Sequence, residues 1–200
     1  MTHPAIAPGA VATITGGGAG IGRAAAMAYA TAGMNLVLID RRAELLDGVA
    51  AEARAAGAPD VVTAGIDVTD RAALSKLETE VAERFGGTDI LMNNAGIGVS
   101  SSIFAEVGPW EATLGVNLWG IIHGCQVFGP RMIARGRPGA IINTGSKQGI
   151  TTPPGNPAYN VSKAGVKAFT EAMAHELRNT PGHAVTAHLL IPGFVFTDMT

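Results

Sequence analysis

An apolar run leads straight into a glycine cluster in Val11-Ala12-Thr13-Ile14-Thr15-Gly16-Gly17-Gly18-Ala19-Gly20-Ile21-Gly22-Arg23. The first five residues suit a buried strand, and a stretch of helical period begins at Ile21. Glycines at such a turn let the backbone adopt positive φ and approach a pyrophosphate, while the helix N-terminus offers free N–H groups. The stretch therefore predicts a phosphate cradle. Its spacing is not the strict Gly-x-Gly-x-x-Gly, and a plain tight turn is the alternative.

Short apolar runs alternate with longer stretches of helical period along the rest of the chain. The predicted strands are Val11–Thr15, Asn35–Ile39, Val61–Ile66, Ile90–Asn93, Ala140–Asn143 and Val185–Leu190. The predicted helices are Ile21–Ala32, Ala43–Ala56, Arg71–Phe85, Pro109–Ala134 and Ala158–Arg178. This alternation predicts an α/β fold with a doubly wound parallel sheet, formed by one domain over residues 1–200.

An acidic residue ends the second predicted strand. Asp40 lies eighteen residues after Gly22, near the distance at which an acid hydrogen-bonds the adenosine ribose of NAD. A carboxylate there also repels a 2′-phosphate, which favours NAD over NADP. Arg41 beside it could instead attract that phosphate, so NADP remains the alternative.

A tyrosine and a lysine stand four residues apart in Ala158-Tyr159-Asn160-Val161-Ser162-Lys163, and Ser146 lies thirteen residues before the tyrosine. A spacing of four puts Tyr159 and Lys163 on one helix face, where the ammonium stabilises the phenolate. This arrangement is typical of a tuned proton donor. A solvated helix face, with the lysine stem packed on the ring, is the alternative.

Composition narrows the function class. The 200 residues are 47% hydrophobic and 15% charged, with a net charge of −2, so no basic footprint for nucleic acid is present. We expect a small-molecule partner. No apolar run reaches the length of a membrane span, and the first eight residues lack a secretion signal, which predicts a cytoplasmic location.

The single cysteine and the histidines do not predict a further site. Cys125 lies among apolar residues, which favours a buried, inert thiol. His123, His175, His183 and His188 share no metal-ligand spacing, so we expect no metal.

The motifs taken together resemble the short-chain dehydrogenase/reductase family. They are Thr15-Gly-x-x-x-Gly-Ile-Gly22, Asn93-Asn94-Ala95-Gly96, Ser146, Tyr159-x-x-x-Lys163 and Pro192-Gly193, in this order, and the likeness runs from about Ala10 to Thr197. The resemblance implies that cofactor contacts come from Gly16, Gly20, Ile21, Gly22, Asp40, Asp67, Val68, Asn94, Ala95, Gly96, Tyr159, Lys163, Pro192, Gly193 and Thr197.

The resemblance also implies a reaction. Hydride transfer between an alcohol carbon and NAD needs a group that moves a proton and a group that holds the oxygen. Tyr159 would supply the proton, Ser146 the hydrogen bond, and Lys163 the contact with the nicotinamide ribose. Asn117 matches the family's asparagine that holds a relay water. We expect an NAD(H)-dependent oxidoreductase of a secondary alcohol or ketone; epimerisation or dehydration, and a nucleotide-binding sensor or scaffold without turnover, are the alternatives.

Some features exceed or depart from the family pattern. Gln148 and Asn156 are predicted to reach the substrate, although each also suits a surface loop. The chain ends at Thr200, whereas the family's chains usually continue, so the last strand and substrate lobe are expected to be missing. The apolar helices after Pro109 and Ala158 predict a homodimer or higher homo-oligomer.

Overall fold

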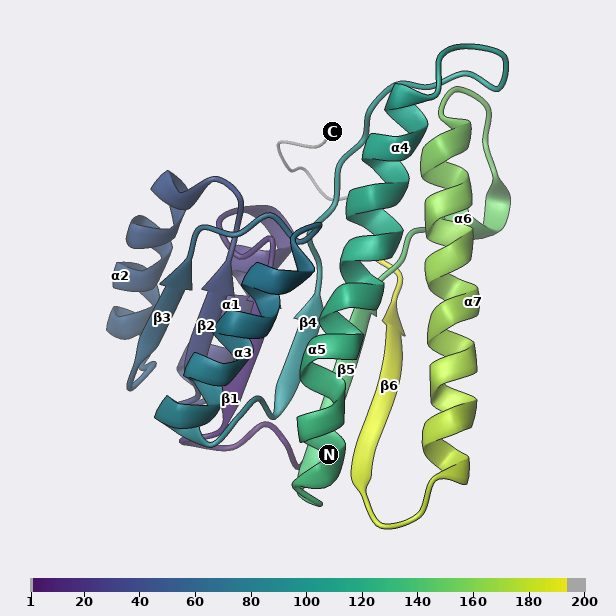
Figure 1. Cartoon of the computed structure of the whole chain (residues 1–200). Coiled ribbons are helices and arrows are strands. Elements are labelled where there is room, and N and C mark those ends of the chain that lie inside the picture. Colours follow the sequence, from purple (N-terminus) through teal and green to yellow (C-terminus); the bar gives the residue numbers. More distant parts are fainter. Residues whose placement is uncertain (1, 194–200) are drawn as a thin grey trace.

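A parallel sheet lies between two layers of helices in the computed structural model, which describes residues 2–193 (Figure 1). Within this range its six strands are β1 (Val11–Thr15), β2 (Asn35–Ile39), β3 (Val61–Ala64), β4 (Ile90–Asn93), β5 (Pro138–Thr144) and β6 (Ala184–Leu190). They are arranged in the order β3-β2-β1-β4-β5-β6, with every neighbouring pair parallel. The predicted doubly wound fold is confirmed: this is the strand order of the Rossmann type.

The helices cover both faces of the sheet. They are α1 (Gly20–Thr31), η1 (Ala43–Leu45), α2 (Leu46–Ala56), α3 (Arg71–Phe85), α4 (Gly108–Leu114), η2 (Gly115–Trp119), α5 (Gly120–Ala134), α6 (Gln148–Thr151) and α7 (Pro157–Asn179). Apolar side chains of α1 and α2 pack on one face, and those of α3, α5 and α7 pack on the other. Figure 1 shows α3 and α5 on the near side of the strands. Because both faces are covered, β1 is buried along its whole length.

Several helix boundaries follow from local chemistry. The Asp70 carboxylate accepts a hydrogen bond from the Ala73 backbone N–H and so caps α3. Gly57 and Gly86 end α2 and α3 in the left-handed conformation, as expected of C-cap glycines. These contacts fix where the chain turns back toward the next strand.

The segment Pro109–Ala134 differs from the prediction of one uniform helix. It is divided into α4, the π turn η2 and α5, and the helix continues through Pro130. The π turn contains Asn117, whose side chain bonds the backbone of Ile97. A contact with a distant segment thus accompanies the break, and the sequence of the helix alone does not show it.

The strand order reverses between β1 and β4. In an open parallel sheet the crevice outside the carboxyl ends of the strands, at such a switch point, is where ligands bind. The glycine loop after β1 and the Asn94 segment after β4 therefore meet at this place.

Candidate active site

The glycine loop between β1 and α1 packs main chain against main chain. Gly16 has a φ of +65°, in the left-handed region. A Cβ added at Gly22 would lie 2.1 Å from the Gly16 carbonyl oxygen. Ala19, the residue before α1, makes no side-chain cap, so the first N–H groups of the helix remain available at the end of the loop. The loop has the form of an anion cradle.

Asn94 ties this loop to the end of β4. Its Nδ2 donates to the carbonyl oxygens of Thr15 (3.2 Å) and Gly16 (3.4 Å). In return, the Thr15 hydroxyl oxygen accepts from the backbone N–H groups of Asn94 and Ala95. The two segments on either side of the switch point are therefore held in one position.

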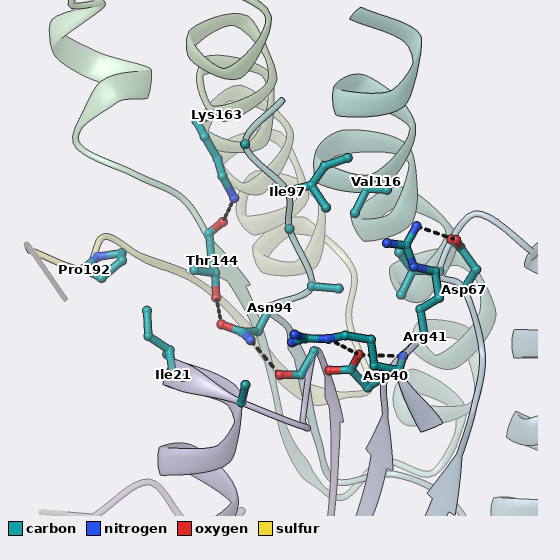
Figure 2. Close-up of a pocket in the computed structure, with 18 of the residues that line it drawn as sticks. Ile21, Asp40, Arg41, Asp67, Asn94, Ile97, Val116, Thr144, Lys163 and Pro192 are labelled. Carbon is teal, nitrogen blue, oxygen red and sulfur yellow. Dashed lines mark hydrogen bonds and ion pairs between the residues drawn. The ribbon is translucent and has the colours of Figure 1, made fainter. Parts of the chain in front are cut away.

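Asp40 lies at the carboxyl end of β2, and its side chain is held by backbone donors. Its Oδ2 accepts from the Gly18 N–H (3.1 Å) and its Oδ1 from the Arg42 N–H (3.0 Å). Arg41 extends instead toward Asp67, with 3.9 Å between Nη1 and Oδ2 (Figure 2). The arginine that could attract a phosphate is thus paired with an acid across the cavity.

Tyr159 and Lys163 both come from the first turns of α7. Lys163 is 3% exposed, its Nζ donates to the Thr144 carbonyl oxygen at 2.8 Å, and it lies 5.7 Å from the centre of the Tyr159 ring. Burial lowers the pKa of the Lys163 ammonium from 10.5 to about 8. The lysine is therefore still mostly charged at neutral pH, next to the phenol.

A row of hydrogen bonds joins the lysine to the glycine loop. Lys163 contacts the Thr144 carbonyl, the Thr144 hydroxyl donates to Asn94 Oδ1 (3.3 Å), and Asn94 donates to Gly16 (Figure 2). The row crosses from α7 over the ends of β5 and β4 to β1. It links the two parts of the predicted site through groups that all line one cavity.

Asn117 is completely buried and makes three hydrogen bonds. Its Oδ1 accepts from the Ile97 N–H (2.8 Å), and its Nδ2 donates to the Ile97 carbonyl (2.9 Å) and to the Ser162 hydroxyl (3.3 Å). The residue thus joins the π turn to the segment after β4 and to α7. The Ser162 hydroxyl in turn donates to the Tyr159 carbonyl oxygen at 2.7 Å, so this group of contacts extends to the turn of α7 that carries the tyrosine.

Ser146 lies two residues beyond β5, and its hydroxyl oxygen accepts from the Gln148 N–H at 3.2 Å. The following short helix packs on α7, because a Cβ at Gly149 would lie 2.5 Å from the Lys163 carbonyl carbon. The serine turn is therefore close to the tyrosine helix. Gln148 itself is exposed.

Asn156 has a structural role that its sequence position did not indicate. It is the N-cap of α7: its Oδ1 accepts from the Tyr159 N–H (3.3 Å) and from the Ser101 hydroxyl (2.8 Å). The Ser101 oxygen also accepts from the Ala158 N–H (3.1 Å). Both residues fix the first turn of the helix that carries Tyr159.

One cavity of about 460 Å³ collects most of the predicted residues, a volume within the range of small-molecule and cofactor sites. The predicted residues that line it are Gly16, Gly20, Ile21, Asp40, Arg41, Asp67, Val68, Asn94, Ala95, Gly96, Tyr159, Lys163 and Pro192. Gly22, Asn117, Ser146, Gln148, Asn156 and Gly193 are not among its lining residues, and Thr197 lies outside the described residues.

Eight further residues line the cavity and were not predicted: Ala19, Arg42, Ile66, Ile97, Gly98, Val116, Thr144 and Gly145. Three of them could have been predicted from their neighbours in the sequence. Thr144 and Gly145 directly precede Ser146, and Ile97 follows Gly96. Val116 gave no signal, since it is one apolar residue in a nearly all-apolar helix.

Other expectations concern residues outside the cavity. Cys125 is buried, as predicted, and burial raises the pKa of its thiol to about 12. Among residues 2–193, no three His, Cys, Asp or Glu side chains are grouped so as to hold a metal ion. In the same range, no helix combines the length and apolar character needed to cross a membrane.

A Rossmann-type sheet with a glycine cradle and a tyrosine–lysine pair at its switch point defines a class of nucleotide-dependent oxidoreductases. A family model described as short chain dehydrogenase matches residues 10–200. The chain belongs to the short-chain dehydrogenase/reductase family.

Individual relatives agree with this assignment. Galactitol 2-dehydrogenase (L-tagatose-forming) of Cereibacter sphaeroides is 38% identical over 195 residues, which are 96% of this chain and 74% of that protein. A short-chain dehydrogenase/reductase of Burkholderia phymatum, solved in complex with NAD, is 38% identical, with a TM-score of 0.93 over 100% of this chain and 69% of the other. NAD⁺-bound xylitol dehydrogenase is 31% identical, with a TM-score of 0.87 over 94% and 71%.

Proposed function

We propose that this protein transfers a hydride between NAD(H) and a secondary alcohol or ketone, with Tyr159 as the general acid and base. The observation that carries the proposal is the composition of one cavity: Tyr159 and the buried Lys163 line it together with the glycine loop and Asp40. A proton-transfer pair and a dinucleotide cradle have no reason to share a cavity unless the chemistry occurs on a bound cofactor.

The residues present fit NAD. Gly16 and Gly20 of the glycine loop line the cavity without side chains, so a pyrophosphate can approach the backbone there, and the N-terminus of α1 favours negative charge. The Asp40 carboxylate suits ribose hydroxyls and repels a 2′-phosphate. NADP is the weaker candidate, because both arginines near Asp40 face acids: Arg41 Nη1 lies 3.9 Å from Asp67 Oδ2, and Arg42 Nε lies 3.7 Å from Asp40 Oδ1.

Bound at this place, the nicotinamide supplies or accepts the hydride. In the direction of reduction, the Tyr159 hydroxyl gives its proton to the carbonyl oxygen, and in the direction of oxidation the phenolate takes it back. The Lys163 ammonium stabilises that phenolate. The Ser146 hydroxyl oxygen accepts from the Gln148 N–H and so keeps its own proton for a hydrogen bond to the substrate oxygen.

Replacing Tyr159 tests the mechanism. Tyr159→Phe removes only the hydroxyl, so turnover should fall by about 10²–10⁴-fold, while NADH affinity changes less than about twofold. Turnover is measured with galactitol and xylitol, because two similar proteins are named as dehydrogenases of these polyols. A panel of apolar ketones is tested as well. NADH fluorescence reports binding.

Tyr29→Phe is the matched control, because Tyr29 is the other tyrosine of the chain and packs from α1 against the core, away from the cavity lining. It should keep normal turnover. Unchanged turnover in Tyr159→Phe would refute the mechanism. A wild-type chain that binds NADH but turns over none of the panel would favour the sensor or scaffold.

A further inference from the structure

Asp40 is held in place by a glycine that the proposed cofactor contacts do not include. Gly18 is buried in the middle of the glycine loop, and its N–H donates to Asp40 Oδ2 at 3.1 Å. The second backbone donor, the Arg42 N–H, binds Oδ1 at 3.0 Å. Each carboxylate oxygen therefore has one main-chain partner, and Oδ1 also lies 3.7 Å from Arg42 Nε. The Oδ2 atom keeps its other lone pair for an incoming ligand.

Space around Gly18 is closed on the side of the carboxylate. A Cβ at this position would lie 2.9 Å from Asp40 Oδ2 and 2.9 Å from the Leu45 Cβ. The φ of Gly18 is not in the left-handed region, so contact, and not backbone conformation, is what demands a glycine here. The Leu45 Cβ is fixed to its main chain and has little freedom to move. Relief must come from the Asp40 carboxylate or from a shift of the loop.

We propose that Gly18 is a positioning residue for cofactor selection, which acts by holding the Asp40 carboxylate in the orientation that accepts ribose hydroxyls and repels a 2′-phosphate. This inference rests on the proposed function, because it assigns Asp40 to the adenosine ribose. It adds that the choice between NAD and NADP depends on a residue that contacts the acid, and not only on the acid itself.

The readout is the ratio of two dissociation constants. NADH and NADPH share the pyrophosphate, so a general distortion of the loop weakens both equally and leaves the ratio unchanged. Displacing Asp40 removes a charged hydrogen bond to the ribose of NADH and relieves repulsion of NADPH. Gly18→Ala should therefore lower the ratio of the NADPH to the NADH constant by about tenfold, measured by fluorescence titration.

Gly17→Ala is the matched control. Gly17 is the neighbouring buried glycine, its φ is also outside the left-handed region, and a Cβ there would meet Ile14 and Leu38 at 3.4 Å, an ordinary contact. This variant should keep the wild-type ratio. An equal fall in both variants, or none in Gly18→Ala, would overturn the inference.

A double-mutant cycle separates the inference from the proposed function. In an Asp40→Ala background the carboxylate that crowds Gly18 is absent, so adding Gly18→Ala should change the ratio by less than about twofold. A further tenfold fall there would show that Gly18 acts independently of Asp40 and would overturn the inference. A wild-type protein that binds neither dinucleotide would instead refute the proposed function.

Discussion

The two ends of the cavity are built in opposite ways. At the glycine end, formed by residues 15–23 and Asp40, main chain packs on main chain, and the acid is held by two backbone N–H groups. Tyr159 and Lys163 form the tyrosine end, and Asn117 supports it from outside the cavity lining. Here the buried side chains of Asn117 and Lys163 reach backbone groups of other segments. The first end should therefore be sensitive to added atoms and the second to removed ones.

The largest expected effect breaks the glycine end by adding one carbon. Gly22→Ala puts a Cβ 2.1 Å from the Gly16 carbonyl oxygen. The position of the Cβ is fixed by its own backbone and the oxygen is a main-chain atom, so no side-chain rotation relieves the contact. We expect unfolding free energy to fall by about 3 kcal/mol and NADH affinity to fall with it. Urea unfolding and fluorescence titration measure the two effects.

Gly48→Ala is the control for this comparison. Gly48 is exposed in α2, and a Cβ there meets nothing within 4 Å. The variant should gain about 0.5–1 kcal/mol from helix propensity. If Gly22→Ala had the same unfolding free energy as the wild type, this would contradict the close packing of Gly22 against the Gly16 carbonyl oxygen.

The second effect probes the buried charge at the tyrosine end through pH. The pKa of Lys163 is about 8 in the folded chain and 10.5 ordinarily, so between these values the unfolded state binds more protons. Unfolding free energy therefore rises with pH in this window. Between pH 7 and pH 10 the wild type should gain about 2 kcal/mol relative to Lys163→Met, which lacks the titrating group.

Urea unfolding of both chains at several pH values gives this difference. Groups other than Lys163 are common to both chains and largely cancel. Parallel curves for the two proteins would contradict the depressed pKa of the lysine.

The smallest effect removes one amide from the tyrosine end. Asn117→Ala leaves the Ile97 N–H and carbonyl without their partner, which should cost about 1–2 kcal/mol of unfolding free energy and lower turnover. Thermal unfolding and the ketone assay measure both. Thr113→Val is the control one turn earlier, because the buried Thr113 hydroxyl has no hydrogen-bond partner among the described residues. Equal losses of unfolding free energy and turnover in the two variants would show that Asn117 contributes only packing and not its hydrogen bonds.

The glycine end was largely predictable from sequence, because its elements are local. The bounds of β1, β2, β4 and α3 agree with the predicted ones. The loop lies between adjacent elements, and Asp40 follows at a spacing set by one helix and one strand. Periodicity and glycine placement are sufficient to place such residues at the same sheet edge.

The tyrosine end was predictable only in part. The spacing of four placed Tyr159 and Lys163 on one helix face, but the partner of Lys163, the Thr144 carbonyl, is a main-chain atom that no residue type reveals. The structure shows that the Asn156 side-chain oxygen caps α7, while its expected contact with the substrate stays a prediction. Caps and substrate contacts use the same polar residues, so sequence position alone does not separate them.

The sequence by itself predicted the parallel α/β fold, which the structure confirms, and it led to the proposals of a phosphate cradle and of a proton-transfer pair. Each of these rests on a periodic pattern or a short spacing. The tertiary structure decided how these residues are held: Gly18 against Asp40, Asn117 against Ile97, and Lys163 against Thr144. Each of these contacts joins residues 19 to 22 positions apart, which become adjacent only after the chain has folded. Their energies depend on burial and distance, which a sequence pattern does not specify.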